Sequence, residues 1–165
     1  NKSVPSLIRV EADEVTYNLH IMLRFDLELG LIEGSIDVND LPRLWNAKME
    51  EYLGIVPDSD ANGVLQDMHW SSGLFGYFPT YTIGNVMSLQ LYSKAVEDYP
   101  SIPSDLSSGD IGSLLRWMRE HIHVHGRKYV PQELLERATG SRLDVGPYIS
   151  YLRSKYGEIY GLLEE

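Results

Sequence analysis

The chain has 165 residues, which is enough for one domain with a hydrophobic core. Acidic side chains outnumber basic ones by 24 to 14, and the net charge of −10 argues against nucleic-acid binding and against attraction to anionic membranes. No apolar run approaches the ~20 residues of a membrane-spanning helix, and the first residues do not resemble a signal peptide. The sequence contains no cysteine, which excludes disulfides and thiolate metal sites, and a cytoplasmic location is expected.

Residues 6–31 are predicted to form one long helix, because apolar side chains recur there at spacings of three and four. Ser6 is placed to cap the start of this helix, and Gly30 and Gly34 mark its end. His20 lies mid-helix among apolar residues, so we expect a core or boundary histidine whose hydrogen bonds are satisfied.

Five further segments show helical periodicity or helix boundaries. They are residues 40–54, 84–97, 111–125, 131–140 and 145–163. Residues 105–113 are expected to form a polar loop. The sequence contains no internal repeat, no low-complexity tract and no convincing strand pattern. It therefore predicts an all-α fold, organised as a single helical domain over residues 1–165.

Residues 63–81 combine glycines and a proline with side chains that can act at neutral pH. Those side chains are Gln66, Asp67, His69, Trp70, Tyr77 and Tyr81. Imidazole and phenol groups can donate protons to a developing oxyanion. The neighbouring amide and carboxylate can orient them through hydrogen bonds. The composition is typical of one wall of a polar cleft.

Several common catalytic signatures are absent from the sequence. It has neither the G-x-S-x-G of a serine hydrolase nor a phosphate-binding glycine loop, and it lacks the zinc-binding H-E-x-x-H. His121 and His125 share a helical face, where they could bind a metal. Alternatively, they lie at the C-terminus of a helix that ends at Gly126, where a charged imidazole interacts favourably with the helix dipole. A nucleophile, metal or general base must then come from elsewhere.

Arg9 has two possible interpretations when the residues alone are considered. It lies among acidic residues, so it could form a helix-surface ion pair of small value. Its guanidinium could instead hold an anionic group through paired hydrogen bonds, since it matches a carboxylate in shape and charge.

Two motifs resemble the thermostable, Taq-type zinc carboxypeptidases. Ile8-Arg9-Val10-Glu11-Ala12-Asp13 matches the family pattern (I/A)-R-x-x-A-D. Gly63-Val-Leu-Gln-Asp-Met-His-Trp70 matches G-x-x-Q-D-(I/V)-H-W except that Met68 replaces the usual Ile or Val. The similarity extends over essentially the whole chain, and the two motifs stand in the family order.

The resemblance implies the C-terminal third of a zincin-type enzyme of roughly 500 residues. Such an enzyme removes single residues from the free C-terminus of peptides, with broad side-chain tolerance. Its zinc or cobalt is held by H-E-x-x-H and a downstream glutamate, all upstream of Asn1, so no metal ligand is expected in this chain. The family fold is a helical, saddle-like body with a deep groove, commonly a homodimer.

The resemblance also implies roles for the residues that match its motifs. Arg9 would face the substrate carboxylate with Gln66, while His69 and either Tyr77 or Tyr81 would stabilise the oxyanion. Asp67, Trp70 and Asp13 would support them. The alternative function, should this chain be a whole gene product, is a non-catalytic helical domain that binds peptides or acts as a scaffold.

Overall fold

A computed structural model describes residues 2–162, and these form helices and loops without any strand, which confirms the all-α prediction. The chain divides into two compact units, Asn1–Thr82 and Ile83–Glu165, each described below by itself. The predicted single domain over 1–165 stays a prediction. Within the described part of the chain, no helix is long and apolar enough to cross a membrane.

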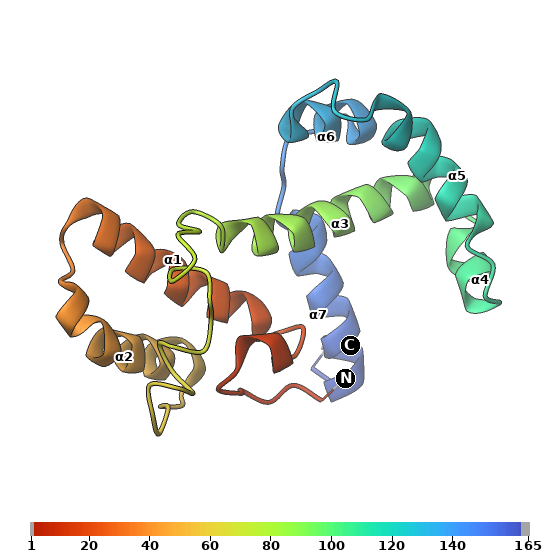
Figure 1. Ribbon diagram of the computed structural model, residues 1–165. Coiled ribbons are helices and arrows are strands. Elements are labelled where there is room, and N and C mark those ends of the chain that lie inside the picture. Colours follow the sequence, from red (N-terminus) through yellow and green to blue (C-terminus); the bar gives the residue numbers. More distant parts are fainter. Residues whose placement is uncertain (1, 163–165) are drawn as a thin grey trace. The chain divides into compact units, whose positions relative to one another are not determined.

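The first unit is built on two helices that lie side by side, α1 (Tyr17–Glu33) and α2 (Leu41–Leu53) (Figure 1). A short 3-10 turn precedes each of them, η1 (Arg9–Glu11) and η2 (Val38–Asp40). One buried apolar cluster joins the two helices. Its members are Leu23 and Leu27 of α1 with Leu41, Trp45, Met49 and Leu53 of α2.

The first helix starts at Tyr17, so the prediction of a start at Ser6 was wrong. The Asp13 carboxylate accepts hydrogen bonds from the backbone N–H groups of Val15 and Thr16 at 2.9 and 3.1 Å, and so caps the chain just before the helix. The Ser6 hydroxyl donates to the carbonyl of Ile8 instead of capping. The spacing of apolar residues alone gave no indication of this side-chain cap.

Both helices of the first unit end before a glycine that the sequence marked, although α1 runs to Glu33, beyond the predicted residue 31 and with Gly30 inside the helix. Gly34 and Gly54 follow the last helical residues with φ of 72° and 69°, a backbone conformation that glycine adopts without steric penalty. The loop of residues 55–78 then leads to α3 (Pro79–Asp98), whose first turn belongs to the first unit.

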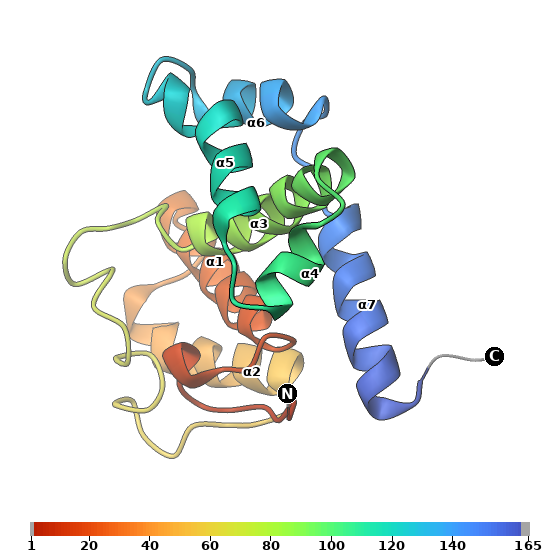
Figure 2. The ribbon, with the colours of Figure 1, turned by 90° about the vertical axis from the view of Figure 1, so that its right-hand side faces the viewer.

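Between residues 83 and 162, the second unit contains the rest of α3 and four further helices. These are α4 (Ile102–Ser107), α5 (Gly112–His121), α6 (Pro131–Thr139) and α7 (Gly146–Tyr160), with the 3-10 turn η3 (His123–His125) after α5. Figure 2 shows α4 and α5 side by side. The buried apolar cluster of the second unit contains Ala95, Ile102, Trp117 and Ala138.

The predicted boundaries in this unit need three corrections. Helix α3 starts at Pro79, before the predicted residue 84, because proline is well tolerated in a first turn. Residues 102–107 form a helix within the region predicted partly as loop. The helix predicted over 111–125 ends at His121. Besides these, α7 ends at Tyr160, short of the predicted residue 163, which itself lies outside the described residues.

Candidate functional site

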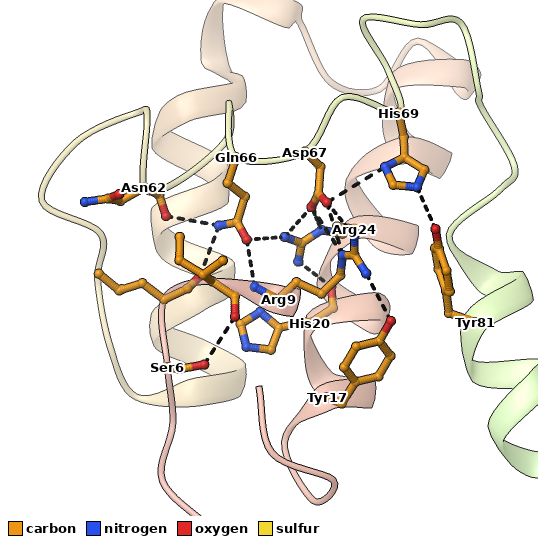
Figure 3. A network of polar contacts seen from close by, with 12 residues as sticks. Ser6, Arg9, Tyr17, His20, Arg24, Asn62, Gln66, Asp67, His69 and Tyr81 are labelled. Carbon is orange, nitrogen blue, oxygen red and sulfur yellow. Dashed lines mark hydrogen bonds and ion pairs between the residues drawn. The ribbon is translucent and has the colours of Figure 1, made fainter. Parts of the chain in front are cut away.

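Asp67 is the centre of a polar network in the first unit (Figure 3). Arg9 donates to Asp67 Oδ1 from Nε and Nη2 at 3.1 and 2.7 Å, and Arg24 donates to Oδ2 from Nε at 2.7 Å. Arg9 is 6% exposed and Arg24 is fully buried. Because two guanidinium groups meet one carboxylate, these three side chains together carry one positive charge in excess.

The charge state of Asp67 follows from this pairing. Burial alone would raise the pKa of Asp67, but the hydrogen bonds from Arg9 and the charge of Arg24 outweigh it and hold the pKa below its usual value. Burial lowers the pKa of Arg24 to about 10, against the opposing effect of Asp67. Asp67 is therefore ionised and both arginines are charged at neutral pH.

The Gln66 side chain hydrogen-bonds both to the polar network and to backbone groups of two separate segments. Its Oε1 accepts from the backbone N–H of Arg9 and from Nη2 of Arg24, both at 2.9 Å. Its Nε2 donates to the carbonyls of Leu7 and Asn62 at 3.0 Å. These four bonds use the donors and acceptors that an amide side chain offers. A direct role of Gln66 toward a substrate stays a prediction.

His69 and Tyr81 form a second pair next to Asp67. His69 Nε2 lies 3.0 Å from the Tyr81 hydroxyl, and His69 Nδ1 lies 3.8 Å from Asp67 Oδ1, beyond hydrogen-bond distance. The Arg9 guanidinium carbon lies 5.0 Å from the centre of the Tyr81 ring, which brings the network and the pair together. The ring of Phe78 lies 4.3 Å from that of His69 and fixes its orientation.

The two candidate tyrosines differ in their relation to His69. Tyr81 makes the hydrogen bond described above, from the first turn of α3. Tyr77 is 45% exposed, and its ring lies 5.6 Å from His69 and 5.5 Å from Tyr81 at the edge of the same aromatic group. The structure therefore couples Tyr81, of the two tyrosines, to the imidazole.

The other two predicted supporting residues lie apart from Asp67. Trp70 Nε1 donates to Glu28 at 2.7 Å, and the N–H of Gly76 donates to the same carboxylate, so Glu28 fixes the loop that follows His69. Asp13 hydrogen-bonds within residues 3–16, where it caps the approach to α1.

Arg24 and Glu28 are site residues that the sequence reasoning missed. Both lie on α1 and both are buried, at 0% and 5% exposure. Arg24 also stacks on the Trp45 ring at 4.5 Å and donates to the carbonyl of His20 at 2.7 Å. The sequence could have indicated both residues, because they lie next to Leu23 and Leu27 on the buried side of the helix, where a charged side chain needs a partner.

His20 corrects a further expectation. It is fully buried, as predicted, but within the described residues neither ring nitrogen has a hydrogen-bond partner, so the predicted satisfied histidine was wrong. Burial, together with the charges of Arg24 and Arg9, lowers its pKa to about 4. The imidazole is therefore neutral at neutral pH.

The histidines near the end of α5 contact aromatic rings. His121 stacks on Trp117 at 4.7 Å between ring centres, and His125 lies 5.3 Å from Tyr129. Across residues 2–162, no three His, Asp or Glu side chains gather as a set of metal ligands. The polar network around Asp67 does not fit a cation either, because its carboxylate is already paired with two arginines.

Comparison with known proteins places these features in a family. Residues 1–156 match the model of the carboxypeptidase Taq (M32) metallopeptidases, and the chain belongs to this family. Carboxypeptidase 1 of Bacillus subtilis is 45% identical over 160 residues, which cover 97% of this chain and 32% of the relative. A thermostable carboxypeptidase 1 of Thermus thermophilus is also 45% identical, over 98% of this chain and 32% of its own.

Solved structures show the same relation. An M32 carboxypeptidase from Deinococcus radiodurans matches 98% of this chain with a TM-score of 0.95 and 48% identity, over 33% of its length. A Pyrococcus furiosus carboxypeptidase matches 93% with a TM-score of 0.90 and 44% identity, over 31% of its length. The chain therefore spans about a third of the relatives that it matches.

Proposed function

We propose that this chain is the part of a metallocarboxypeptidase that holds the end of a peptide substrate and stabilises the oxyanion during hydrolysis of its last residue. The observation that carries the proposal is the His69–Tyr81 hydrogen bond beside a cluster with one excess positive charge. Substrates would be peptides with a free C-terminus and varied side chains.

Tyr81 is the group that would donate to the substrate. A phenol oxygen can accept a hydrogen bond from His69 Nε2–H while its own O–H donates a second one. In this arrangement the imidazole polarises the hydroxyl, and the hydroxyl stabilises negative charge on the scissile carbonyl oxygen. Tyr77, at the exposed edge of the aromatic group, would close the space around the same carbonyl.

Arg9 would meet the substrate carboxylate. Hydrogen bonds to Asp67 and to the Tyr17 hydroxyl occupy its Nε, Nη2 and Nη1, but a guanidinium has five N–H groups, so two remain. The excess positive charge of the network would be neutralised by an incoming carboxylate. Gln66 would hold the Arg9 backbone in place for this contact.

The metal implied by the family must be bound by residues outside those described, because no ligand set is present here. When bound, zinc or cobalt would supply Lewis-acid activation of water. We further propose that the intact enzyme is a saddle-like, groove-containing homodimer located in the cytoplasm, in line with the motifs shared with its family.

Paired peptides test the role of Arg9 in the intact protein. The same peptide is supplied with a free and with an amidated C-terminus, and kcat/KM is measured for both. The wild type should prefer the free form by about tenfold or more, the scale of one charged hydrogen bond, and Arg9→Lys should reduce this preference. Equal cleavage of both forms would refute the role of Arg9. Peptide binding without any cleavage would favour a non-catalytic binding domain.

A further inference from the structure

Helix α1 is apolar on two opposite sides. Leu23 and Leu27 are buried against α2 at 0% and 1% exposure. Four large apolar side chains at spacings of three, four and three lie away from this buried side and form what we call the open stripe. They are Met22, Phe25, Leu29 and Ile32, with exposures of 47, 45, 43 and 68%.

The spacing makes the open stripe a continuous surface. At about 100° per residue, positions three and four apart lie on one side of a helix. A helix with apolar residues on all sides is typical of a helix covered on all sides. Single exposed apolar residues such as Val38, at 71%, are common on protein surfaces and need no partner. The stripe differs because its four members adjoin one another along nearly three turns of the helix.

The length of the relatives indicates what covers the stripe. The matched region makes up 32% of the Bacillus and Thermus carboxypeptidases, so about two thirds of each relative has no counterpart in this chain. A second copy of this chain is a poorer partner, because each copy has a net charge of −10 and Glu33 adjoins the end of the stripe. Two such surfaces would bring like charges together.

We propose that the open stripe docks onto the polypeptide that corresponds to the remaining two thirds of the relatives. This inference rests on the proposed function in so far as the chain is part of a longer enzyme. The partner surface should be an apolar groove whose edge is neutral or basic, to complement Glu33 at the end of the stripe.

The same helix also carries part of the site. Tyr17 and Arg24, which contact Arg9 and Asp67, project from α1. A partner that docks on the open stripe is therefore held in a fixed relation to His69 and Tyr81 through one rigid element. This would place a metal-bearing segment reproducibly beside the oxyanion donors.

Photo-cross-linking in the intact protein tests the docking proposal without depending on activity. Phe25, and in a second variant Leu29, is replaced by the photoreactive amino acid p-benzoylphenylalanine, and the linked peptides are identified by mass spectrometry. The same replacement at Tyr52 is the control, because this partly buried α2 residue packs against the core of the first unit and must link within that unit.

The docking proposal predicts that both stripe positions link to peptides of the same polypeptide that lie outside residues 1–165. Mixed isotope-labelled and unlabelled subunits separate links within one chain from links between copies. Links to residues 83–165, links to a second copy, or no link at either position while Tyr52 reacts would each overturn the proposal. Any of these results leaves the role of Tyr81 untouched, so the two proposals fail separately.

Discussion

At the scale of single residues, the site depends on how buried charges are partnered. Asp67 is held by Arg9 on one oxygen and by Arg24 on the other, and Arg24 is enclosed by Trp45 and Gln66. Buried ion pairs add little net stability, and loss of Arg24 would still leave Asp67 paired with Arg9. The cost of losing Arg24 lies in the buried acceptors on Asp67, Gln66 and His20 that would lose a hydrogen-bond donor.

Replacement of Arg24 should destabilise the first unit strongly. In Arg24→Met the stem length is kept, but Asp67 Oδ2 loses its 2.7 Å donor and keeps only a 3.4 Å bond from Arg9 Nε, while Gln66 loses a donor. We expect a loss of about 2 kcal/mol in the free energy of unfolding, the scale of a hydrogen bond to a charged group, measured by urea denaturation. The matched control is Arg43→Met, which breaks an exposed pair with Asp40 and should have little effect. Equal effects of the two replacements would contradict the proposed importance of Arg24.

His20 should make stability depend on pH. Its pKa is lowered to about 4 in the folded protein, below the ordinary value of 6.5, so between these values the unfolded chain binds more protons. The stabilising contribution is complete above pH 6.5 and is lost as the pH falls toward 4. The groups around it that act on this pKa are Arg24, Arg9, Asp67 and Asp13.

Denaturation of the wild type and of His20→Phe at pH 7.5 and pH 5 checks this dependence. The wild type should lose about 2 kcal/mol between the two conditions, from 1.4 kcal/mol per pH unit below 6.5. His20→Phe should lose clearly less, because its ring cannot bind a proton. A variant with the same pH dependence as the wild type would show that another group is responsible.

At the scale of elements, the helices with terminal signals were predictable. Gly34 and Gly54 ended α1 and α2 as predicted, because positive φ favours glycine, and α6 was predicted almost residue for residue. The start of α1 was missed because the apolar spacing continues through residues 8–15, where the side chain of Asp13 captures the backbone N–H groups instead. The spacing of apolar residues cannot predict that a side chain will compete with the helix for backbone N–H groups.

The Asp13 cap should determine where α1 begins. Asp13→Ala removes the acceptor for the N–H groups of Val15 and Thr16 and should cost about 1 kcal/mol in unfolding free energy. Hydrogen exchange should show faster exchange at the first turn of α1. Asp58→Ala is the control, since Asp58 lies in an exposed loop and its side chain hydrogen-bonds to the nearby Ser59 and Asn62. Unchanged exchange at residues 15–20 in Asp13→Ala would contradict the cap.

At the scale of the whole molecule, the sequence offered candidate site residues but little about how they are arranged. His69 was expected to act with either Tyr77 or Tyr81, and the structure shows a hydrogen bond to Tyr81, while the catalytic role of the pair stays a prediction. Pairing of Arg9 with Asp67 could not be deduced, because contacts between residues 58 positions apart depend on tertiary packing. The matched relatives extend about two thirds of their length beyond this chain, which is why a complete reaction centre cannot be built from these residues alone.

The most direct test of the central claim compares the two tyrosines in the intact, metal-loaded protein. Tyr81→Phe removes the hydroxyl bonded to His69, whereas Tyr77→Phe removes one from the exposed edge of the same aromatic group. We predict that kcat falls about 100-fold in Tyr81→Phe, the scale of losing one oxyanion donor, and less than tenfold in Tyr77→Phe. Metal content and melting temperature should match the wild type in both. A Tyr81→Phe protein with wild-type kcat would contradict the account.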